Sequence, residues 1–381
     1  MKLSLNLFRA LLFVLGPALF AGQQSDAAGN QDSYDISPAP FQLDVEIDLA
    51  VDKVPFEPGD FIFDHIGDAY DWHLFDIDGK HYSVPLPVIV YTREKGLNIF
   101  LSSKFDHGQA TYRGFRIALA GPNEGKIVVA TGDDLSDPYA TRPIDLSITK
   151  NVFGMFFAAF IMLAIFLTIG KSYRRDPLNP PKGIQSLFEP LIIFVIDDIV
   201  KPAIGGNKHE RFLPYLLTLF FFIWINNMLG LIPIFPMGAN VTGNISVTLG
   251  LALTSFLAIN LSGNKHYWQH IFNTPHVPVF LKLPIPIMPI IELVGVFTKP
   301  FVLAIRLFAN ITAGHIITMG FFTLIFIFGQ VSPAFGYGGS VLAVGFGIFI
   351  TFLELLVALI QAYVFTLLTS LFIGAAVEDG H

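Results

Sequence analysis

Cysteine is absent from the 381-residue chain, and charged residues make up only 14% of it. Without cysteine no disulfide can form, so any exported part must be held together by core packing alone. A soluble domain carries about 25% charged residues, so this shortage of charge excludes an ordinary soluble protein. With 53% hydrophobic residues and a mean hydropathy of +0.59, the composition predicts a membrane protein.

The few charges are distributed unevenly along the chain. In residues 30–150 acidic residues outnumber basic residues about two to one, whereas basic residues slightly outnumber acidic ones beyond residue 150. An acidic region is a poor surface for nucleic acid, and we expect no nucleic acid among the partners. The contrast divides the chain into two regions that face different solvents.

The first 27 residues have the features of a signal peptide. Lys2 and Arg9 supply a positive start, and residues 10–20 form an apolar core that is too short to span a bilayer. A retained first membrane helix is the alternative. A signal peptide would place residues 28–150 outside the cytoplasm.

Residues 28–150 are predicted to form a small, acidic, β-rich domain. Apolar and polar residues alternate at every step of 41–49, which is typical of a half-buried strand. Further strand candidates are separated by Gly, Pro, Asn and Asp turn signals; they are residues 82–91, 97–101, 112–119 and 126–130.

Acidic and histidine side chains gather near the start of this domain. They are Asp64, His65, Asp68, Asp71 and His73. Imidazole and carboxylate groups can bind metals, but this spacing fits no standard site. We therefore interpret the cluster as an acidic surface or a docking face, and we predict no metal and no cofactor.

Five apolar stretches of membrane-spanning length follow residue 150. They cover residues 151–169, 212–231, 244–261, 287–328 and 341–375. Basic residues follow the first stretch, beginning at Lys171, and Lys265 and Lys282 follow the third. Because basic loops stay in the cytoplasm, the pattern predicts an outer N-terminus and a cytoplasmic C-terminus. Residues 184–200 suit an amphipathic helix at the membrane surface.

The last two stretches are longer than a bilayer requires. A continuous helix over residues 287–328 would be about 63 Å long, roughly twice the thickness of the hydrocarbon core. This element must tilt steeply, bend, or break near Pro300. We expect two steeply inclined helices side by side, joined by a turn over residues 330–340.

Four charged residues stand in these two stretches: Glu292, Lys299, Arg306 and Glu354. A charge in hydrocarbon costs several kcal/mol, roughly 2.5–3.5 kcal/mol for an arginine at mid-span on insertion scales. Such residues persist where they face a partner, a cavity or water. The stretch therefore predicts a protein that moves ions.

Helical periodicity separates the polar residues into two groups. Glu292, Lys299 and Arg306 are seven residues apart and lie near one face, and Asn310 stays close to it. His315 falls about half a turn away from Arg306.

On the last stretch, Glu354 and Gln361 share a face. Polar residues on different faces, meeting near one arginine, indicate two aqueous paths that do not connect. The alternative is purely structural pairing, such as Glu292 with Lys299 or a hydrogen bond between His315 and Glu354.

At these residues the sequence resembles subunit a of the F-type ATP synthases, in a bacterial form. Three motifs carry the resemblance: KPFVLAIRLFANITAGH at 299–315, LIQAYVF at 359–365, and FLPY at 212–215 with NMLGLIP at 227–233. The similarity covers roughly residue 183 to the C-terminus and includes the five-span plan. The acidic outer domain exceeds the short N-terminus usual in this family.

The resemblance implies a non-catalytic channel subunit that lies beside a rotating c-ring. By this resemblance Arg306 faces the rotor carboxylate, and Asn310 and Gln361 flank it. Glu292 matches an acidic position of the cytoplasmic half-channel.

The external half-channel is implied to contain a histidine and carboxylate pair, His315 with Glu354, together with Asn227 on the second span. The order of this pair along the chain is the one seen in mitochondrial members. Some members have an acidic residue three positions after Asn227, where this chain has Gly230.

The implied partners are the c-ring, b-type peripheral stalk subunits, protons and membrane lipid, in the bacterial inner membrane. Two rival hypotheses remain. The chain could be a stand-alone secondary transporter with an extracytoplasmic sensing domain, or a membrane-anchored binding protein whose outer domain carries the function.

Overall fold

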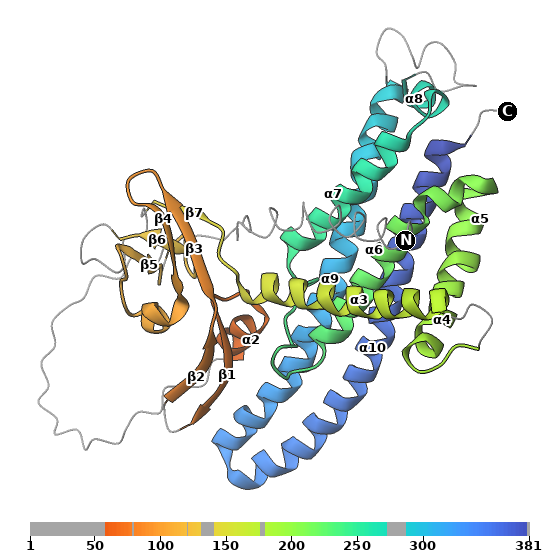
Figure 1. The fold of residues 1–381 in the computed structure, drawn as a ribbon. Helices are drawn as coiled ribbons and strands as arrows, with labels where there is room; N and C mark the ends of the chain where they lie inside the picture. Colours follow the sequence, from red (N-terminus) through yellow and green to blue (C-terminus); the bar gives the residue numbers. More distant parts are fainter. Residues whose placement is uncertain are drawn as a thin grey trace, which may run out of the picture.

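The computed structural model describes residues 58–77, 80–119, 121–130, 141–175, 180–272 and 287–378. A small β-rich region is followed by five helices that are long and apolar enough to cross a membrane (Figure 1). The predicted fold class is therefore confirmed. The expected signal peptide and the expected strand at 41–49 lie outside the described residues.

The N-terminal β-rich domain, which we call the outer domain after its expected location, is built from short antiparallel strands. Its elements are α2 (Pro58–Ile66), β1 (Asp71–Ile77), β2 (Lys80–Pro85), β3 (Pro87–Thr92), β4 (Gly96–Leu101), the 3₁₀ helix η1 (Ser102–Gly108), β5 (Phe115–Ile117), β6 (Ile127–Val129) and β7 (Ile144–Asp145). Strands β1 and β2 pair, β5 pairs with β6, and β3 lies between β4 and β7. A core forms where the inward side chains of these strands meet; it comprises Tyr70, Val88, Val90, Phe105, Phe115 and Ile127.

The strand prediction was right in kind but wrong in several boundaries. The expected strand at 82–91 is two strands, β2 and β3, because the chain passes from one sheet to another near Pro85 and Pro87. Strands β1 and β7 and helix α2 were not predicted. Strand β1 carries Asp71, His73 and Asp76, and this polar content hid its alternation.

The described membrane region contains five long helices and five short helical segments, one of which is the 3₁₀ turn η3 (Gly206–Lys208). The long helices are α3 (Lys150–Arg175), α6 (His209–Gly230), α7 (Ile245–Ser262), α9 (Ile287–Val331) and α10 (Pro333–Val377). In Figure 1, α3 runs across the long direction of α9 and α10. Helix α4 (Ile184–Phe194) continues through the π-helical segment η2 (Val195–Val200) into α5 (Lys201–Ile204), where a surface helix was expected.

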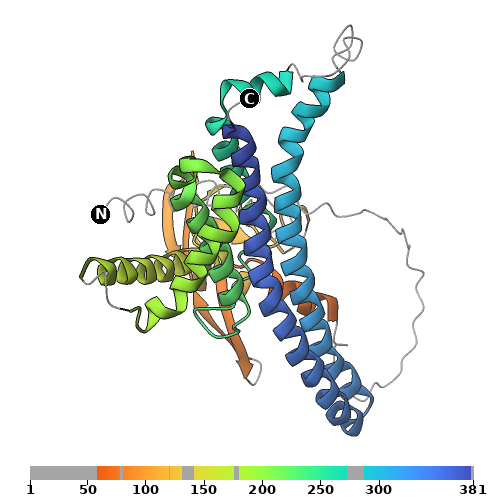
Figure 2. The ribbon, with the colours of Figure 1, turned by 90° about the vertical axis from the view of Figure 1, so that its right-hand side faces the viewer.

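Helices α9 and α10 form one long hairpin, and Figure 2 shows them side by side. Helix α9 passes through Pro300 without ending, so it does not break there. The expected turn at 330–340 was wrong, because the connection is confined to Ser332. The Ser332 hydroxyl accepts a hydrogen bond from the Phe335 amide (3.3 Å), and Pro333 begins α10. A side chain on Gly336 would lie 3.0 Å from the Gly329 Cα atom, so these glycines allow close helix packing.

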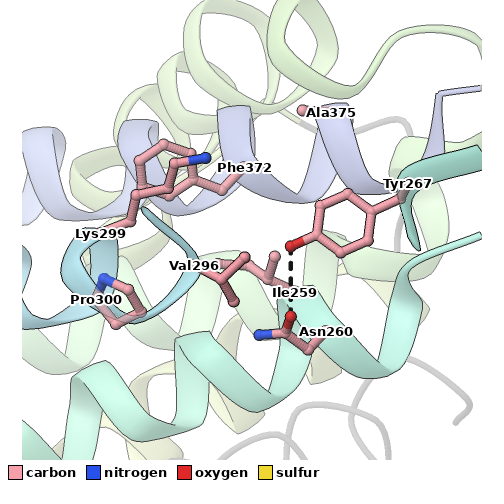
Figure 3. A pocket seen from close by; sticks show the side chains of 8 residues that line it. All are labelled: Ile259, Asn260, Tyr267, Val296, Lys299, Pro300, Phe372 and Ala375. Carbon is pink, nitrogen blue, oxygen red and sulfur yellow. Dashed lines mark hydrogen bonds between the residues drawn. The ribbon is translucent and has the colours of Figure 1, made fainter. Parts of the chain in front are cut away.

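Helix α8 (Lys265–Phe272) follows α7 and contacts the start of α9. Together, α7, α8, α9 and α10 enclose a cavity of about 30 Å³ (Figure 3). The residues around it are Ile259, Asn260, Tyr267, Val296, Lys299, Pro300, Phe372 and Ala375. The cavity therefore lies at the end of α9 that carries Glu292 and Lys299.

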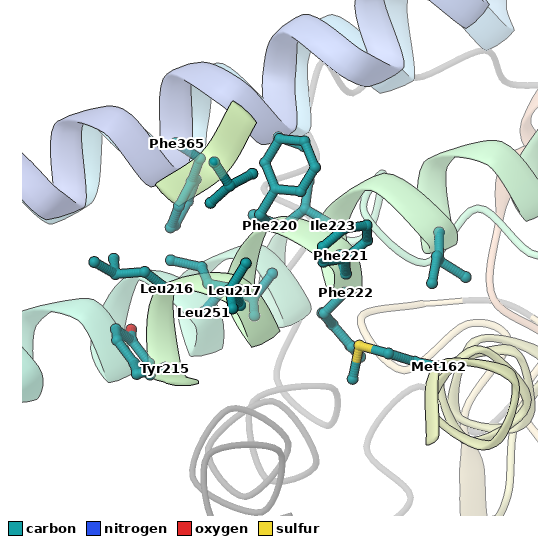
Figure 4. Packing of buried hydrophobic residues seen from close by; sticks show 14 of the residues in the cluster. Met162, Tyr215, Leu216, Leu217, Phe220, Phe221, Phe222, Ile223, Leu251 and Phe365 are labelled. Carbon is teal, nitrogen blue, oxygen red and sulfur yellow. The ribbon is translucent and has the colours of Figure 1, made fainter. Parts of the chain in front are cut away.

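The apolar core of the membrane region is centred on α6. Phe220 and Phe221 are fully buried there, and α3, α7 and α10 contribute Met162, Leu251 and Phe365 to the same cluster (Figure 4). Such contacts hold membrane helices together mainly by van der Waals packing, because lipid tails are as apolar as the side chains themselves. The core fixes α6 against α10, which positions the polar residues described below.

Helix α3 packs closely on the connection between α6 and α7. A Cβ atom on Gly154 would lie 2.6 Å from the Ala239 Cβ atom, whereas one on Gly170 would meet nothing within 4 Å. We expect Gly154→Ala to destabilise the fold by about 1–3 kcal/mol through overpacking. Thermal unfolding of the detergent-solubilised protein should show a midpoint that falls by a few degrees. Gly170→Ala is the matched control, and equal midpoints for both variants would contradict this packing.

Candidate functional site

Arg306 lies on an exposed face of α9. Asn310, one turn further along, is exposed as well, and the neighbouring Val302 and Ile305 are 49% and 40% exposed. Within the described part of the chain, Arg306 makes neither a hydrogen bond nor an ion pair. A permanent positive charge on an apolar surface of this kind requires an anionic partner or water.

His315 lies on the other side of α9, as helical periodicity predicted. It is half-buried, and its Nε2 atom would be 3.9 Å from a Cβ atom built on Gly230 of α6. The missing side chain at position 230 therefore leaves room for the imidazole. The same Cβ atom would lie 3.2 Å from the Ala239 carbonyl oxygen, so the surroundings of His315 are tightly packed.

Glu354 reaches from α10 to the same part of α9. Its Oε1 atom accepts a hydrogen bond from the Thr318 hydroxyl (3.1 Å), and a Cβ atom on Gly314 would lie 2.6 Å from this oxygen. The carboxylate thus lies against α9 where glycine leaves space. No direct hydrogen bond or ion pair joins it to His315 in the described part of the chain, but both groups adjoin residues 314–318.

Asn227 joins α6 to α10. It is 3% exposed, and its amide nitrogen donates to the Ala358 carbonyl oxygen (3.4 Å), one turn after Glu354. Its amide oxygen accepts a hydrogen bond from the Thr242 hydroxyl. Gln361, buried on α10, lies three residues beyond Ala358. Asn227 thus meets α10 at a point between Glu354 and Gln361 along the helix.

A second set of polar side chains surrounds the cavity between α7, α8, α9 and α10. The Tyr267 hydroxyl donates to the Asn260 side-chain oxygen (3.3 Å), and the Lys299 ammonium lies 5.1 Å from the centre of the Phe372 ring (Figure 3). Burial raises the pKa of Tyr267, and the negative charge of Glu292 raises it further. A cavity of about 30 Å³ with these polar groups is large enough for a water molecule.

The alternative of a structural ion pair between Glu292 and Lys299 is not supported. Among the described residues the Lys299 ammonium lies over the Phe372 ring, and Glu292 acts electrostatically on Tyr267. Lys299 and Glu292 therefore interact with different residues and not with each other in the described part of the chain.

The acidic and histidine cluster of the outer domain is spread over two elements and the segment between them. Asp64 and His65 belong to α2, Asp71 and His73 belong to β1, and Asp68 lies between them. In the described ranges no three His, Asp or Glu residues are placed to hold a metal ion. Asp68 contacts α3 instead, so part of the cluster lies at a docking face.

The sequence did not predict a role for four residues of the site, Gly230, Thr242, Gly314 and Thr318, although both glycines stand in the quoted motifs. They carry no charge, and glycine and threonine are ordinary in membrane helices. Their spacing from Asn227 and His315 was the only available signal.

Comparison with known proteins adds to this geometry. A family model described as ATP synthase A chain matches residues 152–374, which is more than half of the chain. The chain belongs to the ATP synthase A chain family. A separate model, described only as a domain of unknown function, matches residues 61–146 of the outer domain.

Individual members of this family share 40–45% of their aligned residues with this chain. The chain is 45% identical to ATP synthase subunit a 2 of Chlorobaculum tepidum over 248 residues, which is 62% of this chain and 66% of that protein. It is 43% identical to ATP synthase subunit a of Chloroherpeton thalassium, over 61% of this chain and 67% of the relative. It is 40% identical to ATP synthase subunit a of Myxococcus xanthus, over 62% of this chain and 75% of that relative. The match thus spans about two thirds of the first two relatives.

The contact between Gly314 and Glu354 can be tested in an assembled complex. We expect Gly314→Ala to displace the Glu354 carboxylate from Thr318, because the new Cβ atom would occupy its place. The carboxylate is the flexible end of its side chain, so the helices need not separate. ATP-driven proton uptake by membrane vesicles should slow several-fold. Gly320→Ala on the same helix, where a Cβ atom meets nothing within 4 Å, is the control; equal rates in both variants would contradict the prediction.

Proposed function

We propose that the chain is the proton-conducting stator subunit of an F-type ATP synthase, without catalytic activity of its own. The observation that carries this proposal is the offset between two polar sites on α9. Arg306 is exposed on one face, whereas His315 lies half a turn away against α6. Membership of the ATP synthase A chain family supports the same function.

The exposed apolar surface of α9 and α10 is proposed to face the c-ring. Apolar side chains there are widely exposed, including Phe301 (52%), Phe352 (69%) and Leu356 (54%). In a membrane such a surface meets lipid or other apolar helices. The outer domain would lie outside the cytoplasm and the C-terminus inside, with b-type peripheral stalk subunits holding the chain against rotation.

The proposed external path passes His315, Glu354 and Asn227. Carboxylate and imidazole groups can accept a proton and pass it on, and an amide can hydrogen-bond to the groups that carry it. These groups lie between α6, α9 and α10, where Gly230 and Gly314 leave space. A proton taken up here would neutralise a carboxylate of the c-ring.

Neutralisation is the step that allows rotation. A neutral carboxyl group can pass through lipid, but an ionised one cannot do so cheaply. After nearly a full turn the carboxyl would meet the cytoplasmic path, which we assign to Glu292 and the cavity beside Tyr267 and Lys299. A membrane potential contributes about 2.3 kcal/mol per 100 mV for each charge moved.

Arg306 would separate the two paths. Its positive charge stabilises the ionised rotor carboxylate, which promotes proton release on the cytoplasmic side. The same charge repels a proton that would otherwise run directly between the paths. Asn310, beside it on the exposed face, and Gln361 on α10 would orient the arginine.

The decisive variant is Arg306→Ala in membrane vesicles. We expect ATP-driven proton pumping to be lost while the other subunits remain assembled, because the barrier and the carboxylate partner are both removed. Val302→Ala, an exposed apolar position one turn earlier, is the control and should pump normally. Normal pumping by Arg306→Ala would refute the stator function, and substrate transport by the purified chain alone would favour the secondary transporter.

The external path is tested by replacing His315 and Glu354 together by leucine. We expect proton conduction to slow at least tenfold and to lose its dependence on external pH, since the titratable groups of the path are gone. Proton uptake should be measured over a range of pH values at a constant membrane potential. An unchanged pH dependence would remove both residues from the path.

A further inference from the structure

Helix α2 of the outer domain packs against α9 near the end of that membrane span. The Phe61 ring on α2 lies 6.1 Å from the Phe326 ring on α9, and Figure 1 shows α2 between the strands and α9. The span of α9 ends at Val331. Since an α-helix rises 1.5 Å per residue, Phe326 lies about 7.5 Å along the helix from that end. Helix α2 therefore meets α9 close to the boundary of the bilayer.

A second contact fixes α2 at the same level. The Lys150 ammonium donates a hydrogen bond to the His65 carbonyl oxygen (3.1 Å) in the last turn of α2. The Lys150 backbone amide donates to the Ala69 carbonyl oxygen (2.9 Å), just after that helix. Lys150 is the first residue of the α3 span. Helix α2 is thus joined to the ends of two membrane spans, which places it at the surface of the bilayer.

The docking of the outer domain is rigid. Asp68 accepts a hydrogen bond from the Asn151 amide (3.0 Å) at the start of α3. Trp72 is buried, and its ring lies 5.8 Å from the Phe153 ring on α3 and 5.4 Å from the Phe235 ring after α6. These contacts hold the segments that follow α2 against the membrane region. The level of α2 relative to the spans is therefore set by the fold.

One side of α2 is open and apolar. Phe63 is 68% exposed, whereas Phe61 and Ile62 are partly buried. Gly59 lies one turn before Phe63 and on the same side of the helix, and a Cβ atom built on it would meet nothing within 4 Å. An exposed phenylalanine at the level of a bilayer surface can bury its ring among lipids.

The position of α2 around α9 favours lipid over the c-ring as its neighbour. Phe326 follows Arg306 by an interval that corresponds to about 200° of rotation on an ideal helix. Helix α2 therefore covers the side of α9 opposite Arg306, away from the proposed rotor surface. Phe326 and Val331 are themselves 51% and 71% exposed, so Phe63 continues an apolar surface of a membrane span. In a membrane that surface meets lipid.

We propose that α2 is an interfacial helix through which the outer domain binds the lipid surface of the bilayer, with Phe63 as the inserted side chain. Helices of this kind bury their apolar face roughly 5–10 Å into the boundary between headgroups and acyl chains. Helix α2 contains Asp60 and Asp64 but neither lysine nor arginine, so attraction to anionic lipid does not drive the contact. The inference goes beyond the proposed proton path and does not depend on it.

The test uses the complete ATP synthase in liposomes of zwitterionic lipid. Because this chain has no cysteine, Phe63→Cys and Gly59→Cys each add one site for a fluorescent label, and the unsubstituted complex gives the background. We expect nitroxide groups on the upper acyl chains to reduce the emission about twofold or more at both positions. Gly59→Cys leaves Phe63 in place, so it decides the question if Phe63→Cys fails to assemble.

Three controls separate insertion from other causes. Leu97→Cys labels a 59% exposed apolar position on β4, which Figure 1 shows away from α9, and it should not be quenched. Adding Phe63→Glu to Gly59→Cys should restore most of the emission, because a carboxylate disfavours insertion. Replacing part of the lipid with anionic lipid should leave the quenching unchanged.

Four outcomes would overturn the proposal. They are full emission at both positions on α2, equal quenching at Leu97→Cys, quenching that appears only with anionic lipid, and quenching in the isolated full chain that disappears in the complete complex. The last would show that another subunit covers Phe63 instead of lipid.

None of these outcomes bears on the stator function, which Arg306→Ala tests separately.

Discussion

The high cost of an unpartnered charge in hydrocarbon organises the whole membrane region. Asn227 is hydrogen-bonded at both ends of its amide, by Ala358 and by Thr242. Glu354 is held by one threonine hydroxyl, and Lys299 by an aromatic ring. Arg306 stands at the end of this series, exposed and without a partner in the described part of the chain. The polar groups of the described chain therefore differ in how completely the chain itself satisfies them.

Close approach of the helices makes these arrangements possible. Glycine at 314 admits the Glu354 carboxylate, and glycine at 347 adjoins the Phe322 ring between α9 and α10. Helix association in lipid depends on such contacts, since burial of apolar surface provides little driving force there. In this chain the glycines both pack the helices and leave the space in which polar groups gather.

The sequence was sufficient for the fold class and for the faces of α9. Long apolar runs indicate the membrane spans. The nine-residue spacing between Arg306 and His315 places them on opposite sides of α9, one exposed and one packed against α6. The turn at Ser332 was missed because glycines that signal a loop in water serve as packing residues between helices. Strand β1 was missed because Asp71 and His73 disguise its alternation. The docking of Asp68 on the start of α3 could not be predicted, since it joins segments far apart in the chain.

The Trp72 ring of the outer domain packs against the Phe153 ring of α3 and the Phe235 ring after α6, and these contacts have a consequence for biogenesis. The core of the outer domain is formed by residues that leave the ribosome before the second span is synthesised. Its docking surface, however, includes Phe235, which follows α6. The domain can thus fold early but can seat only after two spans are in the bilayer. Seating of Trp72 therefore follows synthesis of the second span and cannot precede it.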